Sequence, residues 1–439
     1  MGSDWIEMPF SAAVMVNPGA PLIRGREYPF VDMTAVSPTS RCAFASESRI
    51  FDGGGSRFVA GDILMARITP CLENGKIARF CCAEGQAAHG STEFIVIRGR
   101  DGVTDTAFAY YLTKWEGVSG YAISQMTGTS GRQRVPTSSL DYLTVAIPPL
   151  PVQHAIAYIL NTLDDKIELN RRMNETLEAM ARALFKSWFV DFDPVRAKME
   201  GRWRKGESLP GLPAHLYDLF PARLVDSELG EIPEGWEVGT LGDVAEHPRR
   251  GVQPKSIEPA TPYIALEHMP KQCIALSDWG VTAGVESNKF EFRKGEILFG
   301  KLRPYFHKVG VAPVDGVCST DIVVVAPRTA HWFAFVLGVV SSEEFVEYTN
   351  AGSTGTKMPR TSWAEMARYD IVLPPKAVAQ TFTERVRPAV DRIIAAIHET
   401  RTLATLRDTL LPKLISGELR VKNAHSTILE FDRPTSKEE

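Results

Sequence analysis

The sequence predicts an α+β protein in which two similar mixed α/β domains are separated by two long helices that pair as an antiparallel coiled coil. The first observation is an internal repeat: residues 61–70 (GDILMARITP) return as residues 295–304 (GEILFGKLRP), and residues 91–97 return as residues 319–325. The second observation is that each copy is followed by about 40 residues with a heptad pattern of apolar side chains. A duplication of this size predicts two copies of one structural unit, which we expect to be related by a pseudo-twofold axis.

Short apolar stretches bounded by Gly, Pro, Asp or Ser predict the β-strands of each copy. In the first copy the expected strands are residues 28–33, 63–68, 76–82, 93–98 and 143–147. In the second copy they are residues 263–267, 296–302, 309–312, 322–325 and 370–373. One helix is expected in each copy, over residues 107–114 and near residues 332–340. The two predicted domains span residues 1–147 and 236–373.

A Pro-Pro pair ends each copy, and a predicted long helix follows it, over residues 148–192 and 374–418. The expected contact seam consists of Leu160, Leu163, Ile167, Asn170, Asn174, Leu177, Leu184 and Trp188 in the first helix and Val386, Ile393, Leu403, Leu410 and Leu414 in the second. A single helix cannot bury such a seam, so we expect each helix to pack against the other. Asn170 and Asn174 are polar seam positions that we expect to fix the register, although a loose point facing water is the alternative.

The segment between the first helix and the second domain, residues 193–235, has no duplicate. It is rich in Pro and Gly, and it also carries the large side chains of Trp203, Leu216, Tyr217, Leu219 and Phe220. We therefore expect an ordered linker that docks on a neighbouring domain. Residues 419–439 form a polar tail that we expect to fray.

Composition narrows the class of protein. The net charge of −4 counts against a simple nucleic-acid binder, so any DNA contact requires a local positive patch or a partner. No apolar run has the length of about 18 residues that a membrane span needs, and no signal peptide opens the chain, so we expect a cytoplasmic protein. The six cysteines form neither a CxxC pair nor a metal-ligand spacing, so we expect mostly reduced core thiols and no bound metal.

Catalytic motifs are missing from the sequence, so no catalytic residue is predicted. Residues 295–301 match the phosphate-loop pattern GxxxxGK, but Leu302 stands where a Ser or Thr should hold magnesium. The duplicate of this stretch has Ala66 in place of the second glycine, which makes the match a coincidence. Zinc-protease, nucleophile-elbow and dinucleotide-binding patterns do not occur either.

Polar loop residues at duplicated positions are the better candidates for a functional surface, because long cations reach phosphates and guanine edges while Gln, Ser and Thr contact bases. Arg67 aligns with Lys301, Lys76 aligns with Lys308, and residues 129–136 match residues 353–360. The candidate DNA-binding residues are Arg67, Lys76, Arg79, Thr129, Ser130, Arg132, Gln133 and Arg134 in the first copy, and Arg249, Arg250, Lys301, Arg303, His307, Lys308, Ser353, Thr354, Lys357 and Arg360 in the second. Any single one of them is equally an ordinary solvated charge; their recurrence in both copies favours a function for the set.

The chain resembles the specificity (S) subunit of a Type I restriction–modification system. The residues that carry the resemblance are the two Pro-Pro-plus-helix blocks, the TGTSG…VP loop at 127–136, and the run VDSELGEIPEGW at 225–236. The resemblance covers nearly the whole chain, with one departure: Trp5 matches Trp236, but little of the chain precedes it.

This resemblance implies that each domain is a target recognition domain that reads one half of a bipartite, asymmetric DNA site, and that the two helices set the distance between the halves. It further implies a non-catalytic subunit that recruits two DNA-adenine methyltransferase subunits and, through them, the restriction subunit. S-adenosylmethionine, ATP and magnesium are then expected on the partner subunits, and no cofactor is expected on this chain.

Two other classes of protein remain open on the residues alone. A solitary DNA nuclease or methyltransferase would turn over DNA without a partner. A coiled-coil scaffold that tethers proteins and never touches DNA would give no sequence-dependent footprint, even with methyltransferase subunits added.

Overall fold

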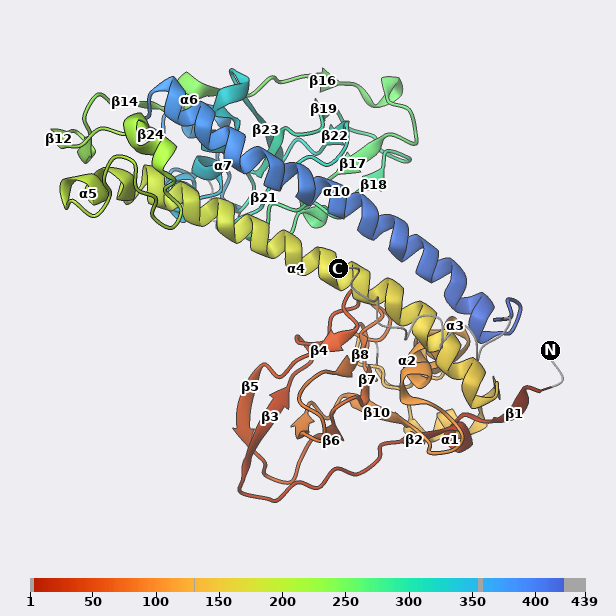
Figure 1. The fold of residues 1–439 in the computed structure, drawn as a ribbon. Helices are drawn as coiled ribbons and strands as arrows, with labels where there is room; N and C mark the ends of the chain where they lie inside the picture. The colour runs from red at the N-terminus through yellow and green to blue at the C-terminus, as the bar shows by residue number, and fades with distance from the viewer. Residues whose placement is uncertain (1–3, 130, 354–357, 422–439) are drawn as a thin grey trace. The chain divides into compact units, whose positions relative to one another are not determined.

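The computed structural model describes residues 4–129, 131–353 and 358–421, and the chain divides into two compact units (Figure 1). The first unit combines Met1–Glu168 with Thr402–Glu439, and the second unit is Leu169–Arg401. Each unit therefore holds one strand-rich copy together with parts of both long helices. Among the described residues, no helix is long and apolar enough to cross a membrane.

The first unit contains two sheets and a separate strand pair. The five-stranded sheet has the order β2 (Val14–Val16), β10 (Phe94–Gly99), β7 (Ile63–Ala66), β8 (Ile77–Phe80), β4 (Cys42–Ala43). The four-stranded sheet has the order β5 (Glu47–Ile50), β3 (Glu27–Val31), β9 (Ala87–Gly90), β6 (Ser56–Val59). The pair consists of β1 (Ile6–Pro9) and β11 (Thr144–Ile147), and the helical elements are α1 (Phe10–Ala13), α2 (Thr106–Lys114), α3 (Glu116–Ser124) and the 3-10 turn η1 (Thr137–Tyr142).

The five-stranded sheet is buried on both faces, which explains its continuous apolar runs. Side chains alternate along each strand, so Leu64 and Val96 pack into a core shared with Phe58 of the four-stranded sheet. Ile63 and Ile95 point to the opposite face and pack in a second core with α2 and the long helices. The first copy is therefore attached to the helices through a continuous apolar core inside the first unit.

The second unit repeats this topology. One sheet has the order β15 (Ala245–Glu246), β23 (Ile322–Pro327), β20 (Ile297–Gly300), β21 (Val309–Val311), and the other has the order β16 (Gly251–Val252), β19 (Lys289–Phe292), β22 (Gly316–Cys318), β17 (Pro262–Ile264), β18 (Gly280–Val281). β14 (Glu237–Thr240) pairs with β24 (Asp370–Leu373). The helical elements are α6 (Leu241–Val244), η3 (Pro254–Ser256), η4 (Leu266–His268), η5 (Pro304–Phe306), η6 (Ala330–Trp332), α7 (Phe333–Val340), α8 (Glu343–Ala351) and α9 (Trp363–Met366).

The correspondence extends to strand direction. β17 pairs with β22 in parallel, as β3 pairs with β9, while the β20–β21 and β7–β8 hairpins are antiparallel. The repeat in the sequence is therefore a repeat of the fold. Every strand that the sequence predicts is present, and the two expected helices are α2 and α7.

The segment without a duplicate is ordered and belongs to the second unit. It contains α5 (Asp193–Met199), η2 (Ala214–Leu219) and a hairpin of β12 (Leu224–Ser227) and β13 (Gly230–Pro233). Trp203 is 1% exposed and Phe220 is 4% exposed, and the ring of Phe220 lies 4.9 Å from that of Trp188 in an edge-on contact. The expectation of a docked linker is confirmed.

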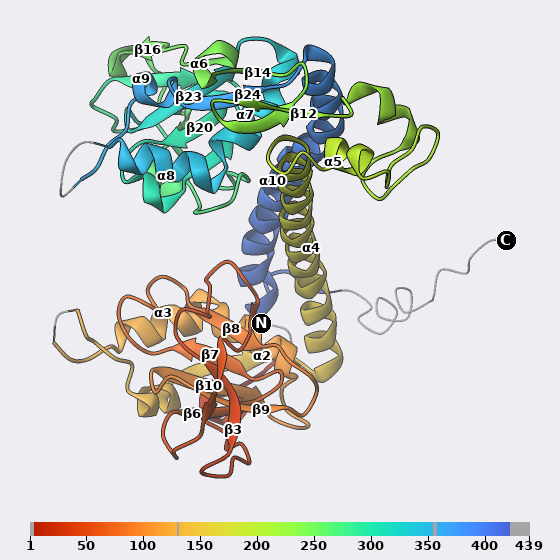
Figure 2. The same ribbon diagram turned by 90° about the vertical axis from the view of Figure 1, so that its left-hand side faces the viewer.

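The two long helices are α4 (Leu150–Phe189) and α10 (Lys376–Ile415), each of 40 residues (Figure 2). Within the second unit, Asn170 Nδ2 lies 3.0 Å from Glu399 Oε2, and the rings of Phe189 and Phe382 are 4.8 Å apart. The later residue on α4 thus contacts the earlier residue on α10, so the two helices run antiparallel, as predicted.

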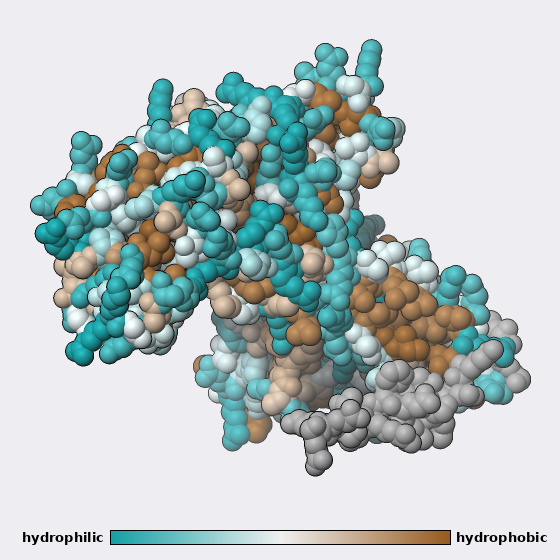
Figure 3. All heavy atoms as spheres, turned by 45° about the horizontal axis from the view of Figure 1, so that its top comes forward, coloured by the Kyte–Doolittle hydropathy of each residue, from teal (hydrophilic) through white to brown (hydrophobic). Residues whose placement is uncertain are grey.

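The predicted seam lies between the helices and the cores they cover. Leu160, Asn170, Trp188, Val386, Ile393 and Leu414 are buried, and the remaining seam residues are half-buried. On the face drawn in Figure 3, hydrophilic side chains predominate and are interrupted by areas of hydrophobic side chains. The exposed large apolar side chains on the two helices are Tyr158, Leu169, Met180 and Leu406.

Four of the six cysteines are free thiols, as expected for most of them, and the other two are bonded to each other. Cys42 and Cys81 form a disulfide with a Cα–Cα distance of 5.5 Å, so this pair is not reduced. The parallel pairing of β4 with β8 brings the two residues together, and no local spacing reveals this because they are 39 residues apart. Cys318 is a buried thiol, and the described residues hold no group of metal-ligating side chains.

Candidate nucleic-acid interface

In each unit a cationic residue, Arg67 or Lys301, directly follows the first strand of a hairpin, β7 or β20, and a loop from later in the chain pairs with it. In the first unit, Val135 N donates to Arg67 O at 2.8 Å, and Thr69 N donates to Gln133 O at 3.0 Å. In the second unit, Thr361 N donates to Lys301 O at 3.1 Å, and Arg303 N donates to Pro359 O at 2.8 Å. The same backbone ladder therefore holds the candidate loop in both copies.

An arginine–carboxylate pair also recurs at this ladder. Arg134 Nη2 lies 2.7 Å from Glu93 Oε1, and Arg360 Nη2 lies 3.3 Å from Asp321 Oδ1. The two arginine side chains are 45% and 53% exposed. A guanidinium has five N–H donors in a fixed fork, so one carboxylate orients it and leaves donors for a phosphate or a guanine edge.

These contacts revise the sequence alignment of the loop. Residues 129–136 were matched to 353–360, which sets Arg134 opposite Met358. The backbone ladder instead sets Arg134 opposite Arg360. The match was two residues out of register because small residues in a loop carry little information about pairing. Ser130, Thr354 and Lys357 lie outside the described residues.

Two aligned lysines serve as internal tethers. Lys76 Nζ donates to Met33 O at 2.7 Å, and Lys308 Nζ donates to Leu266 O at 2.5 Å. Lys76 thereby ties the β7–β8 hairpin to the segment that follows β3, and Lys308 ties the β20–β21 hairpin to the segment that follows β17. Burial, reinforced by the nearby charge of Lys271, lowers the pKa of Lys308. The predicted alignment of Lys76 with Lys308 is confirmed, and the geometry gives both residues a positioning role.

Three further candidates do not lie at the surface of these loops. Strand alternation turns Arg79 toward α2, where burial and the neighbouring Arg41 lower its pKa. Arg250 is held by Glu296 in a half-buried ion pair. His307 is 8% exposed, and its Nε2 lies 3.0 Å from Ser341 O. Sequence reasoning placed all three on the DNA face because it could not see which way each side chain turns.

The remaining candidates stay accessible. Thr129, Arg132 and Arg249 are exposed, and Arg67, Gln133, Lys301, Arg303 and Ser353 are half-buried. Burial lowers the pKa of His247, as do the charges of Arg249 and Lys301, which puts both cations near that ring. Sequence reasoning missed the carboxylates Glu93 and Asp321, although both end a duplicated triplet, Ser-Thr-Glu and Ser-Thr-Asp.

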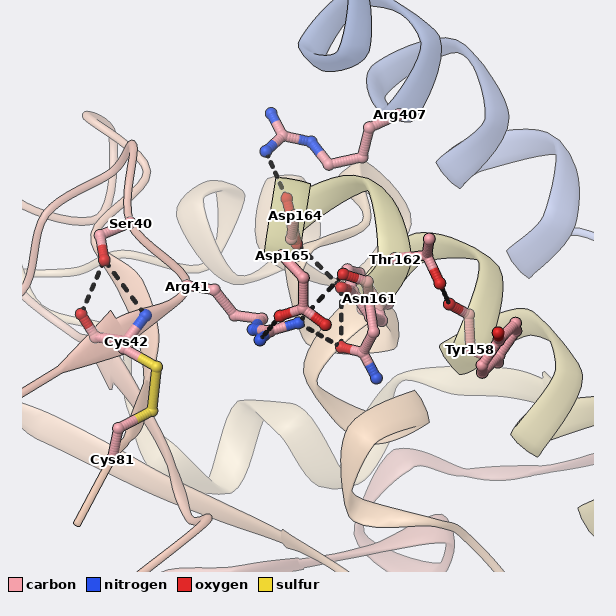
Figure 4. A network of polar contacts seen from close by, with 11 residues as sticks. Ser40, Arg41, Cys42, Cys81, Tyr158, Asn161, Thr162, Asp164, Asp165 and Arg407 are labelled. Atoms are coloured by element: carbon pink, nitrogen blue, oxygen red, sulfur yellow. Dashed lines mark hydrogen bonds and ion pairs between the residues drawn. A yellow bond between two sulfur atoms is a disulfide. The ribbon is translucent and has the colours of Figure 1, made fainter. Parts of the chain in front are cut away.

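A polar network anchors the first copy to the helices (Figure 4). Arg41 donates to Asn161 Oδ1 at 2.8 Å and also pairs with Asp165. The Tyr111 hydroxyl donates to Asp164 at 2.8 Å, and Asp164 accepts from Arg407 at 2.8 Å. Burial raises the pKa of Tyr111, as does the charge of Asp164. The network fixes α2 against both helices inside the first unit.

Comparison with known proteins finds related sequences over most of the chain. Residues 27–179 match the family model of the Type I restriction modification DNA specificity domain. The chain is 28% identical to the Type I restriction enzyme MjaIX specificity subunit of Methanocaldococcus jannaschii, over 74% of this chain and 71% of that protein. It is 26% identical to the HindI specificity subunit of Haemophilus influenzae, over 82% of this chain and 86% of that protein.

Among solved structures, the Type-I restriction-modification system S subunit from M. genitalium matches with a TM-score of 0.52 at 14% identity, covering 94% of this chain and 97% of that one. This match supports the fold. Over these stretches the chain is similar to specificity subunits of Type I restriction–modification systems.

Proposed function

We propose that this chain reads a bipartite, asymmetric site on double-stranded DNA, with one half-site bound by each unit. The observation that carries the proposal is the recurrence of the same ladder and the same arginine–carboxylate pair, Arg134–Glu93 and Arg360–Asp321, in both copies. The side chains at equivalent positions of the ladder differ: Arg132 and Gln133 correspond to Met358 and Pro359, and Thr69 corresponds to Arg303. A repeated frame with unlike side chains suits two different half-sites.

The charge distribution fits this function. A net charge of −4 leaves no overall attraction to DNA, so the local cations must supply the phosphate contacts. Phosphate contacts set register and affinity, whereas base contacts set specificity. We expect binding to weaken as salt rises, since each phosphate contact releases counterions.

The long helices supply spacing and docking. At 1.5 Å per residue, a helix of 40 residues is about 60 Å long, which bounds the distance it can set between half-sites. Exposed apolar side chains such as Leu169 and Met180 on α4 and Leu406 on α10 suit contacts with partner proteins. We propose that two DNA-adenine methyltransferase subunits dock there, bind S-adenosylmethionine, and recruit the ATP- and magnesium-dependent restriction subunit. A pseudo-twofold arrangement would offer them matching surfaces.

Methylation mapping tests this function. DNA from cells that carry the chain together with its modification subunits should show methylated adenines in one two-part motif. Insertion of one heptad into both α4 and α10 should change the spacer of that motif and leave both halves intact. Turnover of DNA by the purified chain alone, with magnesium and S-adenosylmethionine, would instead identify a solitary enzyme. Absence of any motif with partners present would favour a scaffold.

A further inference from the structure

An exposed aromatic side chain lies at the tip of the second unit's hairpin. Tyr305, in η5, is 51% exposed, and its ring lies 4.7 Å from that of Phe306. Lys271 Nζ lies 4.5 Å from the centre of the Phe306 ring, and the Arg303 guanidinium lies 6.0 Å from it. Two aromatic rings and Arg303 therefore share one short turn, and Lys271 reaches it from the segment that follows η4.

The backbone of this turn is strained and firmly held. Arg303 and His307 flank η5 with φ angles of 51° and 50°, a left-handed conformation that residues other than glycine rarely adopt. Phe306 N donates to Arg303 O at 3.0 Å, and Gln272 N donates to His307 O at 2.8 Å. Strain of this kind persists where the surrounding structure enforces it, and it clusters at functional sites. The turn thus presents Tyr305 at a fixed position.

The turn continues directly from the candidate interface. Lys301 and Arg303 precede it, and the Arg303 backbone carries the ladder contact to Pro359. Lys308 follows it, close enough to Lys271 for the charge of one to lower the pKa of the other. Glu267 is the acidic side chain whose charge acts in the opposite sense on Lys308. Three cations, Lys271, Arg303 and Lys308, thus lie at the turn beside the one carboxylate of Glu267, and the helix α8 that packs against η5 adds Glu343, Glu344 and Glu347. A DNA-facing surface needs such a local group of cations.

The first unit lacks this feature at the equivalent position. Pro304, Tyr305 and Phe306 correspond to Pro70, Cys71 and Leu72 in the repeat. There Cys71 is only half-buried, but Leu72 is 1% exposed and packs in the core. The two units therefore share a frame and differ in whether an aromatic ring projects from it.

We propose that Tyr305 stacks on a base of the half-site bound by the second unit and opens the neighbouring base step, while Lys271 and Arg303 hold the flanking phosphates. The proposal rests on the proposed function. Aromatic faces stack on bases of any type, and side chains inserted between base steps unstack them and kink the duplex. Tyr305 would then add affinity and a local distortion at one half-site only.

The test uses the complex of the full chain with its modification subunits and duplexes that carry 2-aminopurine at single positions of the mapped site. 2-Aminopurine fluoresces more strongly when its base step opens. With the unaltered chain, we expect a rise at one position of the second unit's half-site and none in the other half. Tyr305→Ala should abolish the rise and weaken binding about tenfold, since one base–aromatic stack is worth roughly that factor. Tyr305→Phe should keep both.

Cys71→Ala in the first unit is the matched control and should leave fluorescence and affinity unchanged. Thermal unfolding of the Tyr305 variants should match that of the unaltered chain because the ring is exposed. An unchanged rise with Tyr305→Ala, or equal affinity, would overturn the proposal while leaving DNA recognition intact. A complex that fails to bind the mapped site at all, even without substitutions, would instead overturn the proposed function and this proposal with it.

Discussion

The buried ion pair in the first unit allows a quantitative prediction. The Asp164 side chain is 6% exposed and the Arg407 side chain 17%, with 2.8 Å between Oδ1 and Nη1. Asp164→Ala removes an acceptor of both Arg407 and the Tyr111 hydroxyl, and the hydroxyl keeps Asn161 Oδ1 at 3.0 Å. Removal of one partner of a buried ion pair costs about 3–5 kcal/mol, because the other charge stays buried without compensation. Arg407 also pairs with the exposed Asp408, so we expect about 3 kcal/mol, at the lower end.

The assay must report on the first unit alone, since a chain with two units need not unfold in one step. Hydrogen exchange of the α10 segment 402–415, followed by mass spectrometry, measures the opening free energy there. Asp408→Ala is the matched control and should cost less than about 0.5 kcal/mol, as expected for an exposed pair. The double variant Asp164→Leu/Arg407→Leu should recover most of the opening free energy that Asp164→Ala loses, because replacing both members of a buried ion pair by apolar residues is often neutral. A loss below about 1 kcal/mol for Asp164→Ala would refute the reasoning.

Two other predictions concern single residues. Arg134→Ala or Arg360→Ala should weaken DNA binding by about 1–3 kcal/mol and relax specificity in one half-site only, if the guanidinium contacts a base. An equal loss of affinity for all sequences, with a smaller dependence of binding on salt, would show a phosphate contact instead. Unchanged binding would contradict the interface. Burial raises the pKa of the Glu178 carboxyl, so the folded state binds the carboxyl proton more tightly than the unfolded state does. The protonated carboxyl therefore adds to the free energy of unfolding below the pKa of the unfolded state, and this contribution is lost as pH rises through the pKa of the folded state. Glu178→Gln, whose amide oxygen can still accept from Ile274 N, should flatten the acidic pH dependence of second-unit unfolding in denaturant titrations, and an unchanged slope would contradict this.

Strands and helices could be predicted from the sequence where their burial requires a regular pattern of apolar residues along the chain. The apolar runs of β7 and β20 and the heptads of α4 and α10 are long enough to identify themselves. Strands of two residues, such as β4 and β18, carry no such pattern, and only tertiary pairing creates them. The disulfide between Cys42 and Cys81 escaped prediction for the same reason.

The candidate site was predicted in outline. The repeat identified Arg67, Lys301 and the loops at 129–136 and 353–360 as candidates, because a cation that recurs in both copies can be found without knowing which way its side chain points. It could not separate the exposed Arg360 from the buried His307, since exposure depends on how the turn folds. Glu93 and Asp321 were overlooked because only long cations, Gln, Ser and Thr were taken as candidates, although each carboxylate pairs with a candidate arginine.

Exchange of a single recognition copy tests the central claim most directly. Residues 1–147 are replaced by the equivalent copy from a specificity subunit with a different motif, and methylated adenines are mapped across the genome of cells that carry the modification subunits. Independent reading by the two units predicts that one half of the motif changes while the other half and the spacer stay the same. A change in both halves after this single exchange would contradict it.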